Sequence, residues 1–259
     1  MRIALVGFGK MGHMIAAAAR MRGHEVVCTV DIFAEDATCV TKDAAVMVDA
    51  VKASRAEGII EFSHPSSVLP NITALIPTGI PLVVGTTGWR DSLDAVTSAV
   101  KANGSSLLHS ANFSVGVNLF YRIVSEAARL MSSFEEYDVA LFESHHNQKV
   151  DSPSGTGLDL ARRVMEGMPR KTKLVTDAFD RRPEPDELHL ASVRVGSVPG
   201  THTVWFDSAA DTIELTHTAR NREGLALGAV RALEWLALPD GSGKRKTGVF
   251  TMNDVFDSL

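Results

Sequence analysis

The sequence predicts an α/β fold in two parts: an N-terminal Rossmann-type doubly wound parallel sheet and a C-terminal α/β domain with an open mixed sheet. Three observations lead to this prediction. A short apolar run at residues 3–6 leads into a glycine-rich turn and then a helix-forming stretch. The other apolar runs of the first half do not alternate, as expected for strands covered on both faces. Those of the second half come closer to alternation, as expected for a sheet with one open face.

The N-terminal half is predicted to begin with a strand at residues 3–6 and a glycine turn at 7–12. A helix at 14–21 and a second strand at 25–30 follow. This order is typical of the start of a parallel sheet with crossover helices. Further strands are predicted where short apolar runs are bounded by turn residues, at residues 58–62, 81–84 and 105–109.

The C-terminal half has a different pattern. Apolar residues at helical spacing predict helices at residues 113–131, 155–165 and 223–236. A strand is predicted at residues 138–142. Three segments closer to alternation predict a sheet with one face free for a partner, at residues 188–195, 202–206 and 212–218.

Composition excludes several classes of protein. The 259 residues carry 26 Lys and Arg against 31 Asp and Glu, and this net charge of −5 disfavours a nucleic-acid partner. The two cysteines, Cys28 and Cys39, cannot build a disulfide framework, which favours a reducing compartment. No apolar stretch approaches the ~18 residues of a membrane span, and the first apolar run is too short for a signal peptide. We therefore expect a cytoplasmic protein with no membrane partner.

The first glycine motif has the spacing of a dinucleotide-binding turn. Gly7 permits a tight turn, Gly9 lets the backbone approach a pyrophosphate, and Gly12 lets helix and strand pack closely. Asp31 ends the next strand, where an acid accepts hydrogen bonds from an adenosine ribose. Its carboxylate would repel a 2′-phosphate, which favours NADH over NADPH, although Lys10 partly offsets that repulsion. A glycine turn that binds nothing is the alternative.

Two further strand ends carry small polar residues. After the strand at 81–84, small residues would let a flat ring lie against the backbone, and Thr86 and Thr87 offer hydroxyl groups. Residues 110–113 end another strand, where open α/β sheets bind ligands. The alternative for each segment is an ordinary strand end that leads into a loop and binds no ligand.

Residues 143–156 hold the densest group of chemically active side chains. His145, His146 and Lys149 can donate hydrogen bonds or protons. Ser154 and Thr156 belong to a helix start whose amides can hold a carboxylate. We expect no metal, because adjacent histidines point in different directions and no carboxylate or cysteine completes a ligand set. A solvated surface loop is the alternative.

The same segment resembles the signature of the 4-hydroxy-tetrahydrodipicolinate reductase family, also called dihydrodipicolinate reductases. That signature is Glu-x-His-x-x-x-Lys-x-Asp-x-Pro-Ser-Gly-Thr, and it is met by Glu143, His145, Lys149, Asp151, Pro153, Ser154, Gly155 and Thr156. Other stretches similar to the family are residues 84–88 and 111–113, Arg194-x-Gly196 and Gly200-x-His202. The resemblance therefore covers nearly the whole chain.

The resemblance implies roles for particular residues. His145 is expected to be the catalytic histidine and Lys149 the proton donor. The substrate carboxylates are expected to bind His146, Ser154, Gly155 and Thr156. The dinucleotide is expected to bind Gly7, Phe8, Gly9, Lys10, Met11, Gly12, Asp31, Gly85, Thr86, Thr87, Ser110, Ala111, Asn112 and Phe113.

The resemblance also implies an activity and an assembly. Hydride from NADH or NADPH would pass to 4-hydroxy-tetrahydrodipicolinate, or its dehydrated form, to give tetrahydrodipicolinate in diaminopimelate and lysine biosynthesis. Residues 1–113 and 220–259 would form the dinucleotide-binding domain, and 114–219 the domain that binds substrate and builds a homotetramer. Two departures stand out: Gly157, where alanine is commoner, and a short segment before Leu188 that bears on the tetramer contacts.

Two other functions are compatible with a dinucleotide fold. One is a sensor or regulator that has lost catalysis, which would have no need of the His145–Lys149 pair. The other is a dehydrogenase that acts on an amino acid such as aspartate, which leaves the Pro-Ser-Gly-Thr helix start unexplained.

Overall fold

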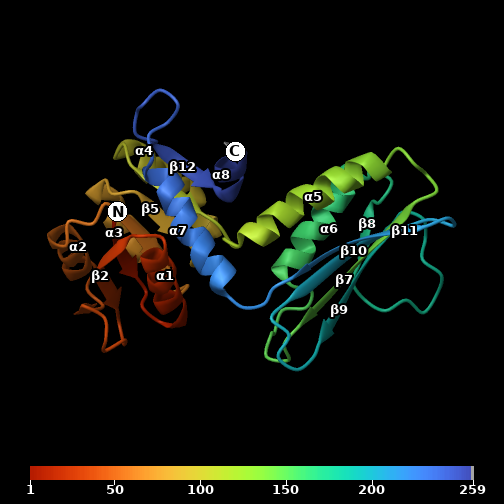
Figure 1. Ribbon diagram of the computed structural model, residues 1–259, viewed down its shortest axis with the longest axis horizontal. Coiled ribbons are helices and arrows are strands. Elements are labelled where there is room, and N and C mark those ends of the chain that lie inside the picture. Colours follow the sequence, from red (N-terminus) through yellow and green to blue (C-terminus); the bar gives the residue numbers. More distant parts are fainter. Residues whose placement is uncertain (258–259) are drawn as a thin grey trace. The chain divides into compact units, whose positions relative to one another are not determined.

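The computed structural model describes residues 1–257, which form two compact units. The first unit comprises Met1–Val115 together with the C-terminal stretch from Arg222 onward. The second comprises Gly116–Asn221. Figure 1 shows both units and labels many of their elements. No helix within the described residues is both long enough and apolar enough to cross a membrane.

The first unit contains a sheet whose pairings are all parallel within the described residues, in the order β12-β6-β5-β4-β1-β2-β3. Its strands are β1 (Arg2–Val6), β2 (Glu25–Asp31), β3 (Cys39–Val40), β4 (Gly58–Glu61), β5 (Leu82–Val84), β6 (Ser106–His109) and β12 (Gly248–Thr251). The predicted Rossmann-type sheet is confirmed.

Helices cover both faces of this sheet. One face packs against α1 (Lys10–Met21), α7 (Glu223–Ala237) and α8 (Met252–Asp257). The other packs against α2 (Ala44–Ala53), α3 (Val68–Leu75) and α4 (Leu93–Ala102), with short 3₁₀ turns at Ile76–Thr78 and Arg90–Ser92.

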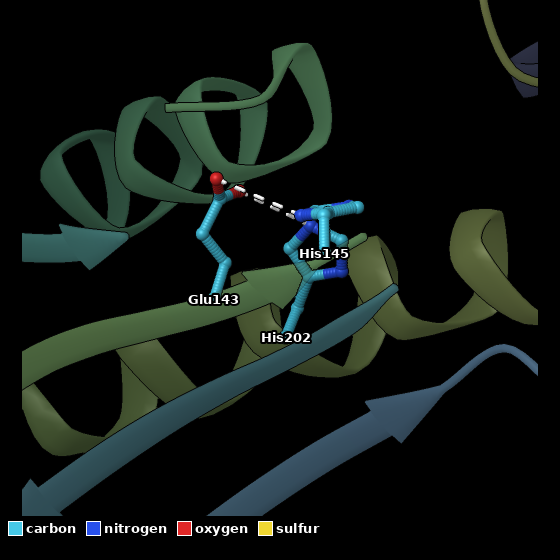
Figure 2. A group of neighbouring side chains, drawn as sticks. All are labelled: Glu143, His145 and His202. Atoms are coloured by element: carbon cyan, nitrogen blue, oxygen red, sulfur yellow. Dashed lines mark ion pairs between the residues drawn. The ribbon is translucent and has the colours of Figure 1, made fainter. Parts of the chain in front are cut away.

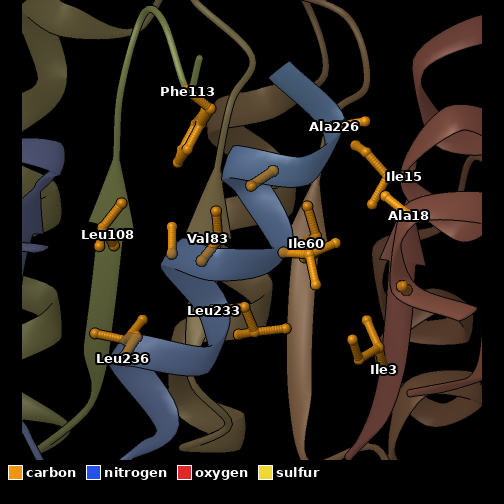
Figure 3. Close-up of a cluster of buried hydrophobic side chains, with 14 of the residues drawn as sticks. Ile3, Ile15, Ala18, Ile60, Val83, Leu108, Phe113, Ala226, Leu233 and Leu236 are labelled. Carbon is orange, nitrogen blue, oxygen red and sulfur yellow. The ribbon is translucent and has the colours of Figure 1, made fainter. Parts of the chain in front are cut away.

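Strand residues alternate between these two cores. In β1, Ile3 and Leu5 belong to the first core, and Ala4 and Val6 to the second. Figure 3 shows the first core, in which Leu233 of α7 lies among strand residues. Because both faces are buried, residues 3–6 of β1 and 82–84 of β5 form continuous apolar runs rather than alternating.

The second unit contains a mixed sheet in the order β11-β10-β7-β9-β8. Its strands are β7 (Asp138–His145), β8 (Lys173–Val175), β9 (Glu187–Arg194), β10 (Thr201–Asp207) and β11 (Thr212–Thr218). β7, β8 and β9 run parallel, whereas β10 is antiparallel to β7 and β11. α5 (Val115–Met131) and α6 (Gly155–Gly167) contribute to the buried core on one face.

The structure differs from the sequence prediction in several elements. The helices α2, α3, α4 and α8 and the strands β3, β8 and β12 were not predicted. β7 extends three residues beyond the predicted end at residue 142 and finishes at His145. The side chains that point into the core are Val139, Leu141, Glu143 and His145. The last two of these are polar, so the hydropathy pattern does not show that the strand continues to His145. This extension places two signature residues on a rigid strand.

Candidate active site

The turn between β1 and α1 has the geometry of a phosphate-binding turn. Gly7 has φ of +92°, and a Cβ there would lie under 3.0 Å from the Phe62 carbonyl oxygen. A Cβ at Gly12 would come equally close to the Gly7 carbonyl, so close packing of α1 on β1 needs glycine. At Gly9, by contrast, no atom lies within 4 Å of a Cβ position. The first amides of α1 therefore face open space in which an anion can bind.

Asp31 ends β2, and its carboxylate holds two loops together. Oδ2 accepts a hydrogen bond from the Phe8 amide at 2.7 Å, and Oδ1 accepts from Phe33 and Ala34 at 2.8 and 3.0 Å. Burial raises the pKa of Asp31, but these backbone hydrogen bonds outweigh burial and hold the pKa below its ordinary value. Asp31 is therefore a fixed, ionised carboxylate.

A cavity of about 1220 Å³ lies at the carboxyl ends of β1, β2, β4 and β5 in the first unit. Its volume exceeds the roughly 1,000 Å³ of a large small-molecule pocket, so it has room for an extended ligand. The predicted cofactor residues on its wall are Gly7, Gly9, Lys10, Met11, Asp31, Gly85, Thr86 and Thr87. Wall residues that sequence reasoning did not find include Phe33, Thr41, Lys42, Ser63, His64 and Asn71.

The other predicted cofactor residues are placed elsewhere in the first unit. Phe8 is buried and stacks on His13, and Gly12 is a packing position. Ser110 and Asn112 bond to each other and close a turn after β6, and Ala111 is exposed. Phe113 is buried in the first core. For these residues, contact with the dinucleotide stays a prediction.

The glycine geometry predicts that Gly9 and Gly12 substitutions have different effects. Gly9→Leu is expected to abolish measurable NADH binding, because the side chain would project into the cavity, while folding stability falls by at most about 1 kcal/mol. Gly12→Ala is expected to lower folding stability, because α1 must move away from the turn. Fluorescence titration with NADH and thermal unfolding distinguish the two. NADH binding by Gly9→Leu at wild-type affinity would contradict this placement.

In the second unit, strand register builds a buried polar cluster around Glu143. His202 on β10 lies directly opposite Glu143 on β7, and Arg194 on β9 lies opposite His145. Glu143 and His145 are two residues apart, so their side chains share one face of the sheet. Figure 2 shows both projecting from β7, with His202 beside them on the neighbouring strand.

The Glu143 carboxylate contacts polar groups of three other residues. Oε1 accepts from the Ser154 amide at 2.9 Å and from Nη2 of Arg194 at 3.0 Å. Oε2 accepts from the Ser154 hydroxyl and lies 3.4 Å from Nε2 of His202. Burial raises the pKa of Glu143, but the bonds from His202, Ser154 and Arg194 outweigh burial and hold it well below its ordinary value. The buried carboxylate is therefore ionised.

His145 is a buried and neutral imidazole. Its Nδ1 is 3.8 Å from Oε1 of Glu143, and its ring meets the His202 ring edge-on, with centroids 5.0 Å apart. Burial lowers the pKa of His145 to about 4, because loss of water, together with nearby positive groups, outweighs the attraction of Glu143. At neutral pH the ring can donate a hydrogen bond or accept a proton, and a bound anion would raise its pKa.

Lys149 and the start of α6 follow β7 directly. Nζ of Lys149 is 2.7 Å from Oδ1 of Asp151. Ser154 caps α6, and its hydroxyl accepts a hydrogen bond from the Gly157 amide at 3.0 Å. His146 is half-buried just after the strand. The structure thus brings the predicted catalytic and carboxylate-binding residues into one strand-loop-helix segment.

Glu143, His145 and His202 offer potential ligand atoms that all lie within 4.8 Å of one another. The Glu143 oxygens, however, already accept hydrogen bonds from Ser154, and the Arg194 guanidinium lies against the same carboxylate. Metal–ligand bonds of about 2.0–2.2 Å would require these contacts to break beside a fixed positive charge. The donor set fits a hydrogen-bonded ionic network better than a metal centre.

Glu143, Arg194 and His202 were not among the predicted site residues. Glu143 was visible only as the first residue of the signature, and Arg194 and His202 only as parts of short family-like stretches. Their convergence depends on strand register, which joins residues 51 and 59 positions from Glu143 and leaves no local pattern in the sequence.

Two family models together match nearly the whole chain. The model described as "Dihydrodipicolinate reductase, N-terminus" matches residues 1–113, and that described as "Dihydrodipicolinate reductase, C-terminus" matches residues 116–256. A 4-hydroxy-tetrahydrodipicolinate reductase of Christiangramia forsetii is 39% identical over 259 residues, covering 100% of this chain and 99% of the relative. Another from Archaeoglobus fulgidus is 36% identical over 266 residues, covering 99% and 100%.

Solved structures share the fold. A dipicolinate-bound dihydrodipicolinate reductase from Paenisporosarcina sp. TG-14 superposes with a TM-score of 0.75 at 20% identity, covering 97% of each chain. A probable dehydrogenase from Thermotoga maritima gives a TM-score of 0.59 at 10% identity, covering 95% of this chain and 90% of that one.

Proposed function

Because this chain belongs to the dihydrodipicolinate reductase family, we propose that it reduces 4-hydroxy-tetrahydrodipicolinate, or its dehydrated form, to tetrahydrodipicolinate in diaminopimelate and lysine biosynthesis. The 4-hydroxyl group leaves as water, and the dehydrated form then gains a hydride and a proton. The observation that carries this proposal is the segment from Glu143 to Thr156, in which an imidazole, an ammonium group and a helix start are held together. Proton donors beside a carboxylate-binding helix start suit a reductase of a cyclic dicarboxylate.

The cavity of the first unit supports a dinucleotide as the reductant. Open space at Gly9, the α1 amides and the fixed Asp31 carboxylate fit a pyrophosphate and a ribose. Bound NAD(P)H would supply the hydride. The ionised state of Asp31 favours NADH, because a 2′-phosphate beside it would be repelled. Lys10 and Lys42 on the same wall reduce that repulsion, so the preference is expected to be modest.

The substrate carboxylates are expected to bind the start of α6. Gly155 and Thr156 offer amides and a hydroxyl there, and His146 adds a hydrogen-bond donor. The amide and hydroxyl of Ser154 already bond to Glu143, so Ser154 is expected to act on the substrate by fixing this helix start. Dipicolinate, bound in the Paenisporosarcina relative, is itself a dicarboxylate. A bound dianion would also favour protonation of His145, since it brings negative charge to a ring that burial keeps neutral.

The reduced bond also needs a proton, and this must come from the protein or from a water that it holds. Lys149 is the candidate donor, because its ammonium group is charged and Asp151 keeps it in place. His145, neutral before substrate binds, is expected to orient the substrate and to share in the transfer once the dianion is present.

The proposal extends to assembly and location. The outer face of the mixed sheet carries partly exposed apolar side chains, among them Phe142, Trp205 and Val193, and Phe142 lies against Trp205. Copies of the chain are expected to cover this face in a homotetramer, with the protein acting in the cytoplasm. Analytical ultracentrifugation tests the tetramer.

The experiment for the proposed activity is a steady-state comparison of both cofactors at 340 nm. NADH oxidation should depend on the dicarboxylate substrate, and kcat/KM should be higher with NADH than with NADPH. Cofactor binding without any substrate-dependent oxidation would favour the sensor function instead.

A substitution at Thr156 is expected to affect substrate binding but not the chemical step. Thr156→Val is expected to raise the substrate KM by about tenfold to a hundredfold, because it removes a hydrogen bond to a charged carboxylate, while kcat changes little. Thr172→Val is the matched control, since the Thr172 hydroxyl bonds to the exposed Asp186. A fall in kcat with an unchanged KM would contradict the assigned role of Thr156.

A further inference from the structure

Glu61 is a buried carboxyl group that the mechanism above does not use. It ends β4, its side chain is fully buried, and it pairs with Val6 on β1 and Val84 on β5. Its backbone carbonyl accepts a hydrogen bond from the Gly85 amide at 2.9 Å. Glu61 therefore lies directly behind the wall of the cofactor cavity.

Three neutral side chains from that wall surround the Glu61 carboxyl group. Oε1 accepts hydrogen bonds from the Ser63 hydroxyl and from Nδ2 of Asn71 at 3.2 Å. Asn71 also donates to Ser63 at 3.2 Å. These residues lie on the loop after β4 and on α3, and both line the cavity. One carboxyl oxygen thus joins two parts of the wall.

The other carboxyl oxygen faces a third part of the wall. Oε2 of Glu61 and Oγ1 of Thr86 are both buried, and neither has a hydrogen-bond partner of good geometry within residues 1–257. The Thr86 hydroxyl is nevertheless a neighbour of the carboxyl group, whose pKa it lowers. No cationic side chain of the described residues pairs with Glu61. A proton on Oε2 would satisfy both atoms at once, because Oε2–H can donate to Oγ1.

We infer that Glu61 is a neutral carboxylic acid that positions the dinucleotide-binding wall, accepting from Ser63 and Asn71 through Oε1 and donating to Thr86 through Oε2. Burial raises the pKa of Glu61, whereas the polar side chains of Ser63, Asn71 and Thr86 lower it. Burial has the larger effect, so the pKa lies above its ordinary value. An uncompensated charge in this position would be costly, whereas a neutral acid gives both Oε2 of Glu61 and Oγ1 of Thr86 a hydrogen-bond partner. The inference rests on the proposed placement of the dinucleotide in this cavity.

The test compares NADH affinity across substitutions at Glu61. Glu61→Gln reproduces a neutral acceptor and donor in the same shape, so its NADH Kd should stay within about threefold of wild type. Glu61→Ala removes both functions and should weaken NADH binding by about tenfold or more. At saturating NADH, kcat and the substrate KM of Glu61→Ala should stay near wild type, which general misfolding would not allow.

Substitutions at Thr86 examine the other end of the same contact. Thr86 lies on the cavity wall, but its Oγ1 is buried, so we expect this hydroxyl to act on NADH binding through Glu61. Thr86→Val should therefore weaken NADH binding, and Thr86→Ser should not. The double variant Glu61→Ala/Thr86→Val should therefore lose no more affinity than the weaker-binding single variant. If Glu61→Ala does not fold, the Thr86 variants still test whether the contact between Glu61 and Thr86 supports NADH binding.

Three results would overturn the inference: Glu61→Gln binding NADH as weakly as Glu61→Ala, Glu61→Ala binding as tightly as wild type, or additive losses in the double variant. Gly9→Leu, titrated alongside, tests the cavity itself. If Gly9→Leu still binds NADH, the placement of the dinucleotide is wrong. If Gly9→Leu fails to bind while Glu61→Ala binds normally, only the role of Glu61 is wrong.

Discussion

Replacing Lys149 or His145 with alanine is expected to lower kcat by about 10²–10⁴, while NADH affinity stays near the wild-type value. Both residues lie in the second unit, and the cavity proposed for the dinucleotide is formed entirely by residues of the first. Loss of a positioned proton donor acts on the chemical step, since the reduced bond must still gain a proton from solvent. Pre-steady-state and steady-state measurements at 340 nm give kcat and the cofactor KM separately.

Lys173→Ala is the matched control for Lys149. Lys173 belongs to the same unit and also pairs with a carboxylate, Glu187, at 2.8 Å. Its removal should leave kcat unchanged. Turnover close to wild type in both Lys149→Ala and His145→Ala would show that neither residue delivers the proton.

Glu143→Ala is expected to lower folding stability by about 3–5 kcal/mol and to abolish turnover. The substitution leaves the half-buried Arg194 guanidinium and the buried Ser154 cap without their shared acceptor. Glu143→Gln keeps the shape but not the charge, so it should lose less stability and still turn over poorly. Urea unfolding and kcat at saturating substrate measure the two effects independently.

The pH dependence of stability provides a second readout for Glu143. Its pKa in the folded protein lies below the unfolded value of 4.5, so ionised Glu143 contributes stability above pH 4.5 that is lost as pH falls toward the folded-state pKa. The stability advantage of wild type over Glu143→Gln should therefore shrink below pH 4.5. Glu187→Gln is the control, because Glu187 also bonds to cations, Arg181 and Lys173, yet should affect stability without affecting kcat. Equal kcat in Glu143→Gln and wild type would contradict a role for this carboxylate in the site.

The N-terminal site could be predicted because its signals are local. The glycine spacing, the preceding strand and Asp31 all lie within 31 residues, and Gly7 and Gly12 have a direct steric reason in the structure. Helices α2 and α3 lacked such clear signals. α3 is eight residues long with Pro70 near its start, and α2 is recognisable mainly by the Asp43 side chain that caps it.

The cluster around Glu143 could be predicted only in part. The signature placed His145, Lys149 and Ser154 close together in sequence, but the partners of Glu143 come from other strands. The same applies to β12, which pairs with β6 across more than 130 residues. Such contacts are set by tertiary packing and register, which a single sequence does not encode as a local pattern.

The most direct test of the reductase mechanism uses NADH carrying deuterium at both C4 positions. In a single turnover with 4-hydroxy-tetrahydrodipicolinate, the tetrahydrodipicolinate formed should carry one deuterium from the cofactor, and the accompanying proton should come from solvent-exchangeable positions. Product without cofactor-derived deuterium, or cofactor that is bound but not oxidised, would contradict hydride transfer to this substrate.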